Sequence, residues 1–287
     1  MKIVEIDPVF TNNSTRNAFR SVINKHDFVS YETVPANENE FIARAANADA
    51  IIVSNIPISK TIVSRCENLK MISVAFTGLD HIDMNECNKR GISVRNAAGY
   101  STQSVAELTL GLVLDLLRKI TELDSNTRSL KSRNGFAGLE LAGKSIGIIG
   151  AGAIGSQVGT ILNMLGCNVF FTSRTTKPNT QWGIYLPFDE LLRKSEIITL
   201  HIPLNKETEH LINSASIAKM KDGVYIINTA RGKVIDYNAL ANALASGKVA
   251  GAAIDVYETE PPIDSTHPLL SAPNCILTPH IAYATKE

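Results

Sequence analysis

The 287-residue sequence has few cysteines, no excess of either charge and no long hydrophobic run. Its four cysteines lie far apart, and no C-x-x-C pair or His/Cys cluster indicates a metal site. Lysine plus arginine and aspartate plus glutamate number 28 each, so no net basic charge favours nucleic acid. The apolar stretches are too short for a membrane span, and acidic residues interrupt the N-terminal MKIVEIDP, which therefore predicts a strand and no signal peptide. We expect a cytoplasmic protein with reduced thiols that binds neither nucleic acid nor membrane.

Glycines organise the centre of the chain. An apolar run at 145–149 predicts a buried parallel strand, and Gly150, Gly152 and Gly155 follow it as G-x-G-x-x-G. Such glycines permit a tight turn, let a pyrophosphate approach the backbone, and let the next helix, about 153–165, pack closely on the strand. In this context the pattern predicts a dinucleotide site; the alternative is a tight strand–helix turn without a ligand.

The next predicted strand, 168–172, ends in Ser173 and Arg174 without an acidic residue. A carboxylate at this place usually holds the ribose hydroxyls of NAD and would repel a 2′-phosphate. Serine can hydrogen-bond a 2′-phosphate and arginine can pair with it. The sequence therefore favours NADP(H) over NAD(H); the alternative is that Arg174 is a solvated surface residue.

Two α/β domains are expected, because strand and helix patterns alternate before and after one long helical segment. In the first domain the predicted strands are 2–6, 28–33, 50–53, 70–74 and 92–95, and the helices are 12–24, 39–46, 59–66 and 83–89. Between the domains, residues about 102–130 predict one long helix, apolar over much of its surface, at a domain or dimer interface. In the second domain the predicted strands are 145–149, 168–172, 196–201, 223–228, 249–254 and 275–278, and the helices are 153–165, 188–194, 214–219 and 236–246. Residues 131–143 are predicted as an exposed loop.

Three side chains that follow predicted strands of the second domain point to catalysis, because ligands of such sheets bind beyond the carboxyl ends of the strands. Arg231 could hold a carboxylate in a bidentate fork and polarise a neighbouring carbonyl. Glu260 precedes two prolines that fix its loop, and His280 follows Pro279, which holds the preceding residue extended. The alternatives are a surface ion pair for Arg231, an exposed loop carboxylate for Glu260, and a core or surface imidazole for His280.

Several long stretches, in order, resemble the D-isomer-specific 2-hydroxyacid dehydrogenase family, which includes D-lactate, glycerate/hydroxypyruvate and phosphoglycerate dehydrogenases. These are SVAFTGLDHID, NAAGYSTQSVAELTLGLVLDLLR, ELAGKSIGIIGAGAIG, LHIPLNKETEHLIN, INTARGKVID, GAAIDVYETEPP and LTPHIA. The resemblance implies two Rossmann-like parallel-sheet domains. They would be a flavodoxin-like substrate domain at 1–98, with 282–287 returning towards it, and a dinucleotide-binding domain at 99–281. It also implies a homodimer. Members usually continue through a further helix that packs on the first domain.

The resemblance assigns roles residue by residue. Arg231, Glu260 and His280 match the catalytic set, in which the histidine donates a proton and an ionised glutamate beside it favours the imidazolium. Asp255 would accept from the nicotinamide carboxamide. The cofactor-binding residues would be Gly150, Gly152, Ala153, Ile154, Gly155, Ser173, Arg174, His201, Pro203, Thr208, Thr229, Ala230, Asp255 and Ser104. The substrate-binding residues would be Ala75, Phe76, Thr77, Gly78, Tyr100 and Tyr283, and no metal is expected.

The implied reaction is hydride transfer between NAD(P)H and C2 of a small 2-oxo acid such as hydroxypyruvate, glyoxylate or pyruvate. Tyr283 stands where many members have glycine, and together with Phe76 and Tyr100 it predicts a narrow pocket; the alternative is that Tyr283 packs between domains. A second function stays open, an NAD(H)-sensing scaffold that resembles the C-terminal-binding-protein corepressors, which share the fold and the Arg/Glu/His set. The lack of long polar tails disfavours it. No residue points to a third possibility, a relative acting on an inorganic anion such as phosphite.

Overall fold

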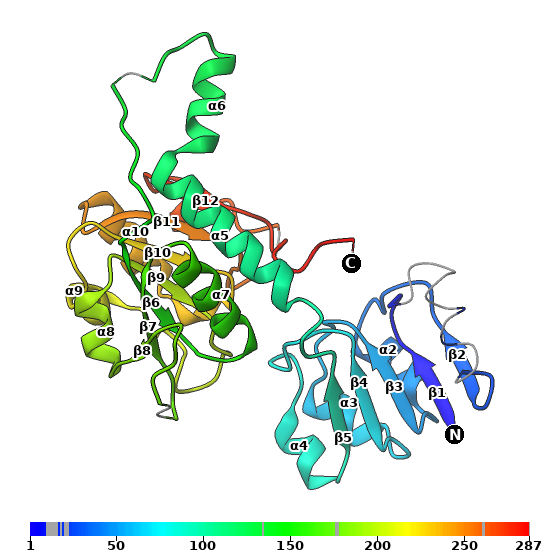
Figure 1. Cartoon of the computed structure of the whole chain (residues 1–287). Helices are drawn as coiled ribbons and strands as arrows, with labels where there is room; N and C mark the ends of the chain where they lie inside the picture. The colour runs from blue at the N-terminus through cyan, green and yellow to red at the C-terminus, as the bar shows by residue number, and fades with distance from the viewer. Residues whose placement is uncertain are drawn as a thin grey trace. The chain divides into compact units, whose positions relative to one another are not determined.

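The computed structural model describes residues 1–9, 17, 19, 23–133, 135–175, 178–259 and 262–286. The chain divides into two compact units, Met1–Tyr100 and Ser101–Glu287. Each unit is built around its own parallel sheet (Figure 1). The predicted α/β class with two parallel-sheet domains is therefore confirmed. The predicted association of residues 282–287 with the first unit stays a prediction.

The first unit holds a five-stranded sheet in the order β2-β1-β3-β4-β5, the order of flavodoxin-like sheets. Its strands are β1 Lys2–Glu5, β2 Asp27–Ser30, β3 Ala50–Val53, β4 Met71–Val74 and β5 Ser93–Asn96, and its described helices are α2 Glu38–Ala45, α3 Lys60–Arg65 and α4 Met84–Lys89. The inner strands are apolar because helices cover the sheet, and Val4, Ile51 and Ile72 are fully buried. The helix predicted at 12–24 falls largely outside the described residues.

The second unit holds a seven-stranded parallel sheet in the order β12-β11-β10-β9-β6-β7-β8 (Figure 1). Its strands are β6 Ser145–Ile149, β7 Asn168–Thr172, β8 Ile184–Tyr185, β9 Ile197–Leu200, β10 Val224–Asn228, β11 Val249–Ile254 and β12 Cys275–Leu277. Its helices are α5 Thr102–Arg118, α6 Ile120–Arg128, α7 Ala153–Met164, α8 Phe188–Lys194, α9 Ser214–Ala218 and α10 Tyr237–Ala245, with 3-10 turns η1 Gly232–Val234 and η2 Pro268–Leu270. Strand order reverses between β6 and β9, and such a switch point is where dinucleotides bind.

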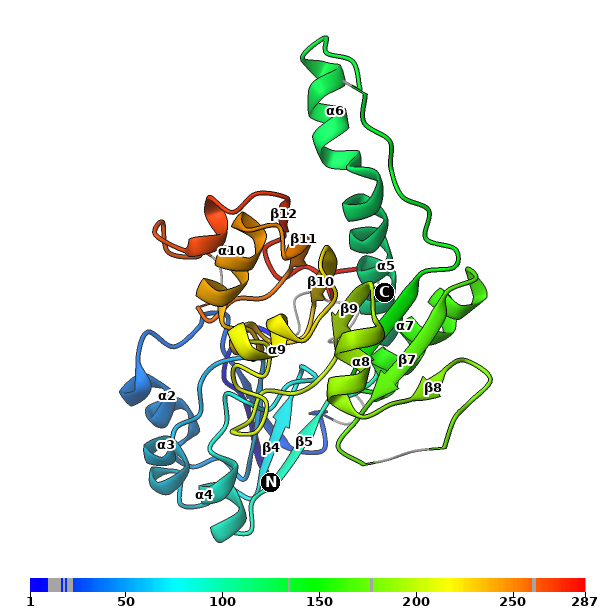
Figure 2. The ribbon, with the colours of Figure 1, turned by 90° about the vertical axis from the view of Figure 1, so that its left-hand side faces the viewer.

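The prediction of a single long helix over about 102–130 is wrong, because the structure has two helices there, α5 and α6, which are separated at Lys119. Lys119 adopts a left-handed conformation with φ of 49°, and the carboxylate of Asp115 accepts from the backbone N–H of Thr121 at 2.9 Å. This local cap ends one helix and starts the next. Helix α6 buries none of its residues and stands away from the rest of the second unit (Figures 1 and 2).

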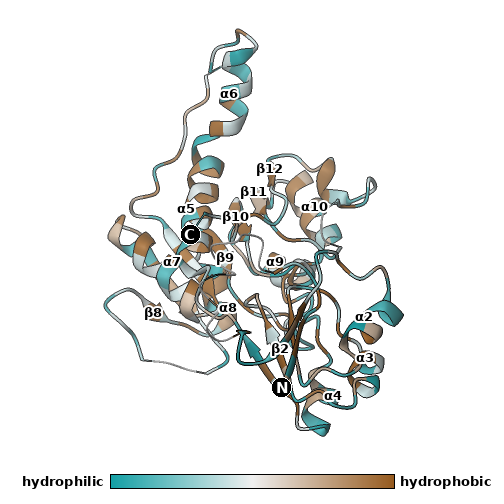
Figure 3. Cartoon of the chain, turned by 90° about the vertical axis from the view of Figure 1, so that its right-hand side faces the viewer, coloured by the Kyte–Doolittle hydropathy of each residue, from teal (hydrophilic) through white to brown (hydrophobic). Residues whose placement is uncertain are grey.

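Hydropathy follows this arrangement within each unit. The strands are mostly hydrophobic, whereas α6 mixes hydrophilic residues with single apolar ones (Figure 3). Residues 131–143 are mostly exposed apart from the buried Leu141, as predicted, with residue 134 outside the described part. Among the described residues, no helix combines the length and hydropathy that a membrane crossing needs.

Candidate active site

The glycine-rich loop follows β6 and fits closely against the end of β9. Gly150 has a φ of 103°, and a Cβ added there would lie 2.3 Å from the carbonyl oxygen of His201. A Cβ on Gly155 would lie 1.9 Å from the carbonyl oxygen of Gly150. Both positions therefore require glycine for packing, independently of any ligand.

Gly152 differs, because a Cβ added there would meet nothing within 4 Å. It is the N-cap of α7 and offers no side chain to the N–H groups of the first turn, which includes Ala153 and Ile154. These donors and the positive end of the helix dipole suit an anion, and the space beside Gly152 admits one close to the backbone. The loop therefore fits the pyrophosphate of a dinucleotide.

Ser173 and Arg174 lie directly after β7, the strand next to β6. The Ser173 hydroxyl donates to the carbonyl of Thr175 at 2.7 Å and keeps its lone pairs for other donors. Arg174 is exposed. Neither residue is acidic, so this strand end carries no carboxylate for ribose hydroxyls.

His201 follows β9 at the switch point. Its Nε2 lies 3.0 Å from the hydroxyl of the buried Thr199, and burial lowers the pKa of His201 to about 3. The imidazole is therefore neutral at physiological pH. The loop after it is closed by Thr208, whose hydroxyl donates to the carbonyl of Pro203 at 2.7 Å.

Arg231 follows β10 in a turn that Asn228 holds. The buried Asn228 side chain accepts from the N–H of Ala230 at 3.0 Å and donates to the carbonyl of Arg231 at 2.9 Å. The Arg231 guanidinium is half-buried and donates to the carbonyl of Ala230 at 2.7 Å. The turn therefore holds the Arg231 backbone at the sheet edge.

Two further cofactor candidates, Thr229 and Ser104, have hydroxyl groups with partners in the chain. The hydroxyl of Thr229 is 3.1 Å from that of Thr109 on α5, and Ser104 on the same helix donates to the carbonyl of Ser101 at 3.1 Å. Both hydroxyls therefore have partners within the second unit.

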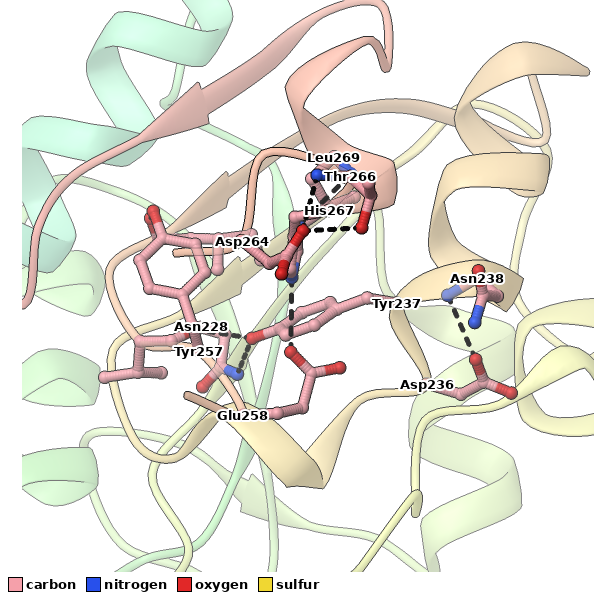
Figure 4. Close-up of polar contacts among 12 residues, drawn as sticks. Asn228, Asp236, Tyr237, Asn238, Tyr257, Glu258, Asp264, Thr266, His267 and Leu269 are labelled. Carbon is pink, nitrogen blue, oxygen red and sulfur yellow. Dashed lines mark hydrogen bonds and ion pairs between the residues drawn. The ribbon is translucent and has the colours of Figure 1, made fainter. Parts of the chain in front are cut away.

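The loop after β11 packs directly on the Arg231 turn. A Cβ on Gly232 would lie 2.0 Å from the carbonyl carbon of Tyr257, so the two backbones touch. Within this loop Glu258 Oε2 lies 3.2 Å from His267 Nε2 (Figure 4). The His267 ring is tilted against that of Tyr237 and lies edge-on to that of Tyr257, with centroids 5.3 and 5.7 Å apart. The predicted Glu260 lies outside the described residues.

His280 follows β12, at the outer edge of the same row of strand ends. Its ring meets that of Tyr283 edge-on, with 5.5 Å between centroids. Asp255, after β11, is fully buried, and its two oxygens accept from Thr278, Ile281 and Ala282. These are three of the roughly four hydrogen bonds that a carboxylate can accept, and the predicted contact of Asp255 with a carboxamide stays a prediction.

The pairing registers show which predicted residues come together. Asn228 pairs with Ile254, and Ile254 pairs with Leu277, so Arg231, Asp255 and His280 follow adjacent strands at one edge. The substrate candidates Ala75–Gly78 follow β4 in the first unit, where Asn96 donates to the carbonyl of Thr77 at 2.6 Å. The rings of Phe76 and Tyr100 lie edge-on, 6.4 Å apart.

Sequence reasoning missed the residues that support this edge. Asn228 and Thr278 end or follow strands, and Tyr257 donates to the carbonyl of Thr278 at 3.0 Å. A polar residue at the end of an apolar strand was the available signal, but its partners lie on other strands and are not encoded locally.

Comparison with known proteins agrees with this geometry. Residues 110–282 match the model of the D-isomer specific 2-hydroxyacid dehydrogenase NAD binding domain. A D-3-phosphoglycerate dehydrogenase from Archaeoglobus fulgidus is 42% identical over 88% of the chain, and a glyoxylate reductase from Thermofilum pendens is 40% identical over 88%. The structure of an acyclic imino acid reductase in complex with NADPH and D-Arg superposes with a TM-score of 0.92, at 32% identity, over 100% of this chain and 92% of that one.

These relatives differ in length. The chain spans about half of the phosphoglycerate dehydrogenase, 48%, and 77% of the glyoxylate reductase. The glycine-rich loop at the switch point, the row of strand ends and the family match over more than half of the chain lead to one conclusion. The chain belongs to the NAD(P)-dependent, D-isomer-specific 2-hydroxyacid dehydrogenase family.

Proposed function

We propose that this protein reduces a small 2-oxo acid to a D-2-hydroxy acid with a nicotinamide dinucleotide. The observation that carries the proposal is the row of strand ends in the second unit. Arg231 and His280 follow β10 and β12 of the same parallel sheet whose β6–α7 loop fits a pyrophosphate. A cation, a proton donor and a dinucleotide loop at one sheet edge are the parts that such a reduction needs.

The residues act on the developing alkoxide. Bound NAD(P)H would supply the hydride to C2 of the substrate. Arg231 would hold the substrate's carboxylate and stabilise negative charge on the carbonyl oxygen. His280 would donate a proton to that oxygen, a contribution of about 10²–10⁴-fold in rate for a positioned acid, and Glu260 is proposed as the carboxylate partner of its imidazole.

We propose NADP(H) as the preferred cofactor. Arg174 presents an exposed guanidinium after β7, where a carboxylate would repel a 2′-phosphate. The Ser173 hydroxyl would bind the phosphate by turning away from the carbonyl of Thr175. The similar imino acid reductase is described in complex with NADPH. The remaining cofactor residues predicted above are proposed in the same roles.

We propose a small or slender substrate. Tyr283 lies edge-on to His280, so its ring limits the room beside the proton donor. The backbone N–H groups of Ala75–Gly78 would bind the substrate's carboxylate. Glyoxylate, hydroxypyruvate and pyruvate meet these limits.

A second candidate substrate class is the 2-imino acids. The similarity to an acyclic imino acid reductase, with a TM-score of 0.92, favours it. A C=N bond at C2 has the shape of the C=O bond, and Arg231 would hold the carboxylate in the same way. Addition of an amine to the assay separates the two candidates.

We also infer a homodimer in a reducing compartment, the cytoplasm. Helix α6 exposes Ile120, at 56%, and Leu130 follows it, 97% exposed. All four cysteines are free, and three of them are buried.

The test is a panel of 2-oxo acids, with and without ammonia or methylamine, assayed with NADPH and with NADH. We expect substrate-dependent oxidation of NADPH, faster than that of NADH. Cofactor binding without turnover of any acid would contradict the enzyme assignment and favour the sensing scaffold.

A further inference from the structure

The turn that carries His280 has an unusual backbone. His280 has a φ of 55°, in the left-handed region that residues with a Cβ rarely adopt. Residues held in this region persist only when the surrounding structure imposes the conformation. Something in the second unit must therefore fix the chain on both sides of His280.

Asp255 supplies that constraint. Its Oδ1 accepts from the hydroxyl of Thr278 at 2.6 Å and from the N–H of Ile281 at 2.9 Å, and its Oδ2 accepts from the N–H of Ala282 at 2.9 Å. One carboxylate thus joins the residue two positions before His280 to the two residues after it. Asp255 is fully buried and Ala282 is 3% exposed, so water cannot replace these acceptors without opening the turn.

No other described group takes over this task. Pro279 has no N–H, and the N–H of His280 donates to the carbonyl of Thr278 at 3.1 Å, inside the turn itself. The hydroxyl of Tyr257 donates to the carbonyl of Thr278 at 3.0 Å, which holds the start of the turn but not its end. The Ile281 and Ala282 amides have Asp255 as their acceptor.

We infer that Asp255 is a positioning residue: its buried carboxylate imposes the left-handed conformation of His280 and thereby aims the imidazole. The inference rests on the proposed role of His280 as proton donor. It adds to the role that family resemblance suggests for Asp255, because a carboxylate can accept about four hydrogen bonds and Oδ2 accepts only from the N–H of Ala282.

The variant that tests this is Asp255→Asn. An Asn side chain has one oxygen and one NH2 group, so in either orientation its NH2 faces a backbone N–H of Ile281 or Ala282. Asp236→Asn is the matched control, because Asp236 caps α10 with one oxygen only, which accepts from Asn238 and Ala239 (Figure 4). Asparagine caps a helix as well as aspartate does, so this control keeps its bonds.

The first measurement is hydrogen exchange in the full chain without ligand, followed at the amides of Ile281 and Ala282. Asp255→Asn is expected to speed exchange there about tenfold or more, and Asp236→Asn to leave it unchanged. Unchanged exchange in Asp255→Asn would overturn the inference. Because no substrate is needed, this result stands even if the proposed function fails, and absence of turnover in the wild type would contradict only the proposed function.

The second measurement is kinetic. Asp255→Asn is expected to lower kcat about 100-fold through misplacement of His280, while the dissociation constant of NADPH stays within about twofold. Asparagine keeps an oxygen that can accept a hydrogen bond, so a contact with the cofactor is not removed outright. Unchanged kcat in Asp255→Asn would overturn the inference.

Thr278 provides a milder variant if Asp255→Asn does not fold. Thr278→Val removes one of the three hydrogen bonds to Asp255, and we expect kcat to fall about tenfold, with Thr278→Ser restoring it. Equal kcat in Thr278→Val and Thr278→Ser would count against the inference.

Discussion

Single residues at the strand ends of the second unit divide into those that hold the backbone and those left for a ligand. Asn228 and Asp255 are fully buried, and their side chains form hydrogen bonds with the turns that carry Arg231 and His280. Arg174 is exposed, and neither it nor Ser173, the two residues that follow β7, is acidic. The chemistry is therefore prepared by one set of residues and performed by another.

Arg174 decides the choice of cofactor in this account. Arg174→Asp would replace an ion pair with repulsion toward a 2′-phosphate, so NADPH should bind at least about tenfold more weakly and NADH nearly unchanged. Fluorescence titration with each cofactor measures this, with Arg174→Lys as the control that keeps the charge. Equal weakening of both cofactors would contradict the assigned role.

His201 makes the fold sensitive to acid. Burial lowers the pKa of His201 to about 3, so between its ordinary pKa near 6.5 and pH 3 the unfolded chain binds a proton that the folded chain does not. Stability therefore falls as the pH falls through this window. His201 keeps partial exposure, so we expect a moderate effect. Between pH 7 and pH 5 the free energy of unfolding should fall by about 1 kcal/mol more in the wild type than in His201→Asn. Urea unfolding at the two pH values measures the difference, and equal losses would refute it.

At the scale of elements, the β6–α7 connection needs glycine for two reasons, close packing at Gly155 and room for a ligand at Gly152, and separate variants can distinguish them. Gly155→Ala should destabilise the fold by about 1–3 kcal/mol, because its Cβ would meet the carbonyl oxygen of Gly150 at 1.9 Å. Gly152→Ala should leave the melting temperature near that of the wild type but weaken NADPH binding, since its Cβ enters the space beside the helix N-terminus. Gly111→Ala on α5, also in open space, is the control that should bind normally. Normal binding by Gly152→Ala would place the phosphates elsewhere.

The sequence was enough to predict most elements, and the reasons differ from one to another. Buried parallel strands are short apolar runs closed by glycine or polar residues, so the strands at 145–149, 168–172 and 249–254 agree with the structure at both ends. The break at Lys119 depends on one Asp115–Thr121 cap, and the two-residue strand β8 carries too little pattern to detect. The positions of Arg231 and His280 after strands were predictable; the bonds of Asp255 were not, because residues 278–282 reach it only through the fold.

For the whole molecule, α6 supports the expected dimer. Ile120 and Leu123 line a surface hollow at the α5–α6 junction, and no residue of α6 is buried in the single chain. Burying Ile120 and Leu130 against a partner would contribute about 3 kcal/mol to the free energy of association. This lowers the dissociation constant of the dimer by about a hundredfold. The double change Ile120→Lys and Leu130→Lys should therefore give monomers in sedimentation velocity.

Leu270, 52% exposed and distant in sequence, provides the control, and Leu270→Lys should leave the dimer intact. Sedimentation of the wild type as a monomer at every concentration would refute the dimer.

The central claim is that His280 protonates the oxygen of a 2-oxo acid whose C2 receives the hydride. The most direct measurement compares kcat for NADPH oxidation with glyoxylate or hydroxypyruvate in wild type and His280→Ala, together with the NADPH dissociation constant of each. We expect kcat to fall by about 10²-fold or more in His280→Ala while NADPH binding stays near normal. Unchanged turnover in His280→Ala would contradict it.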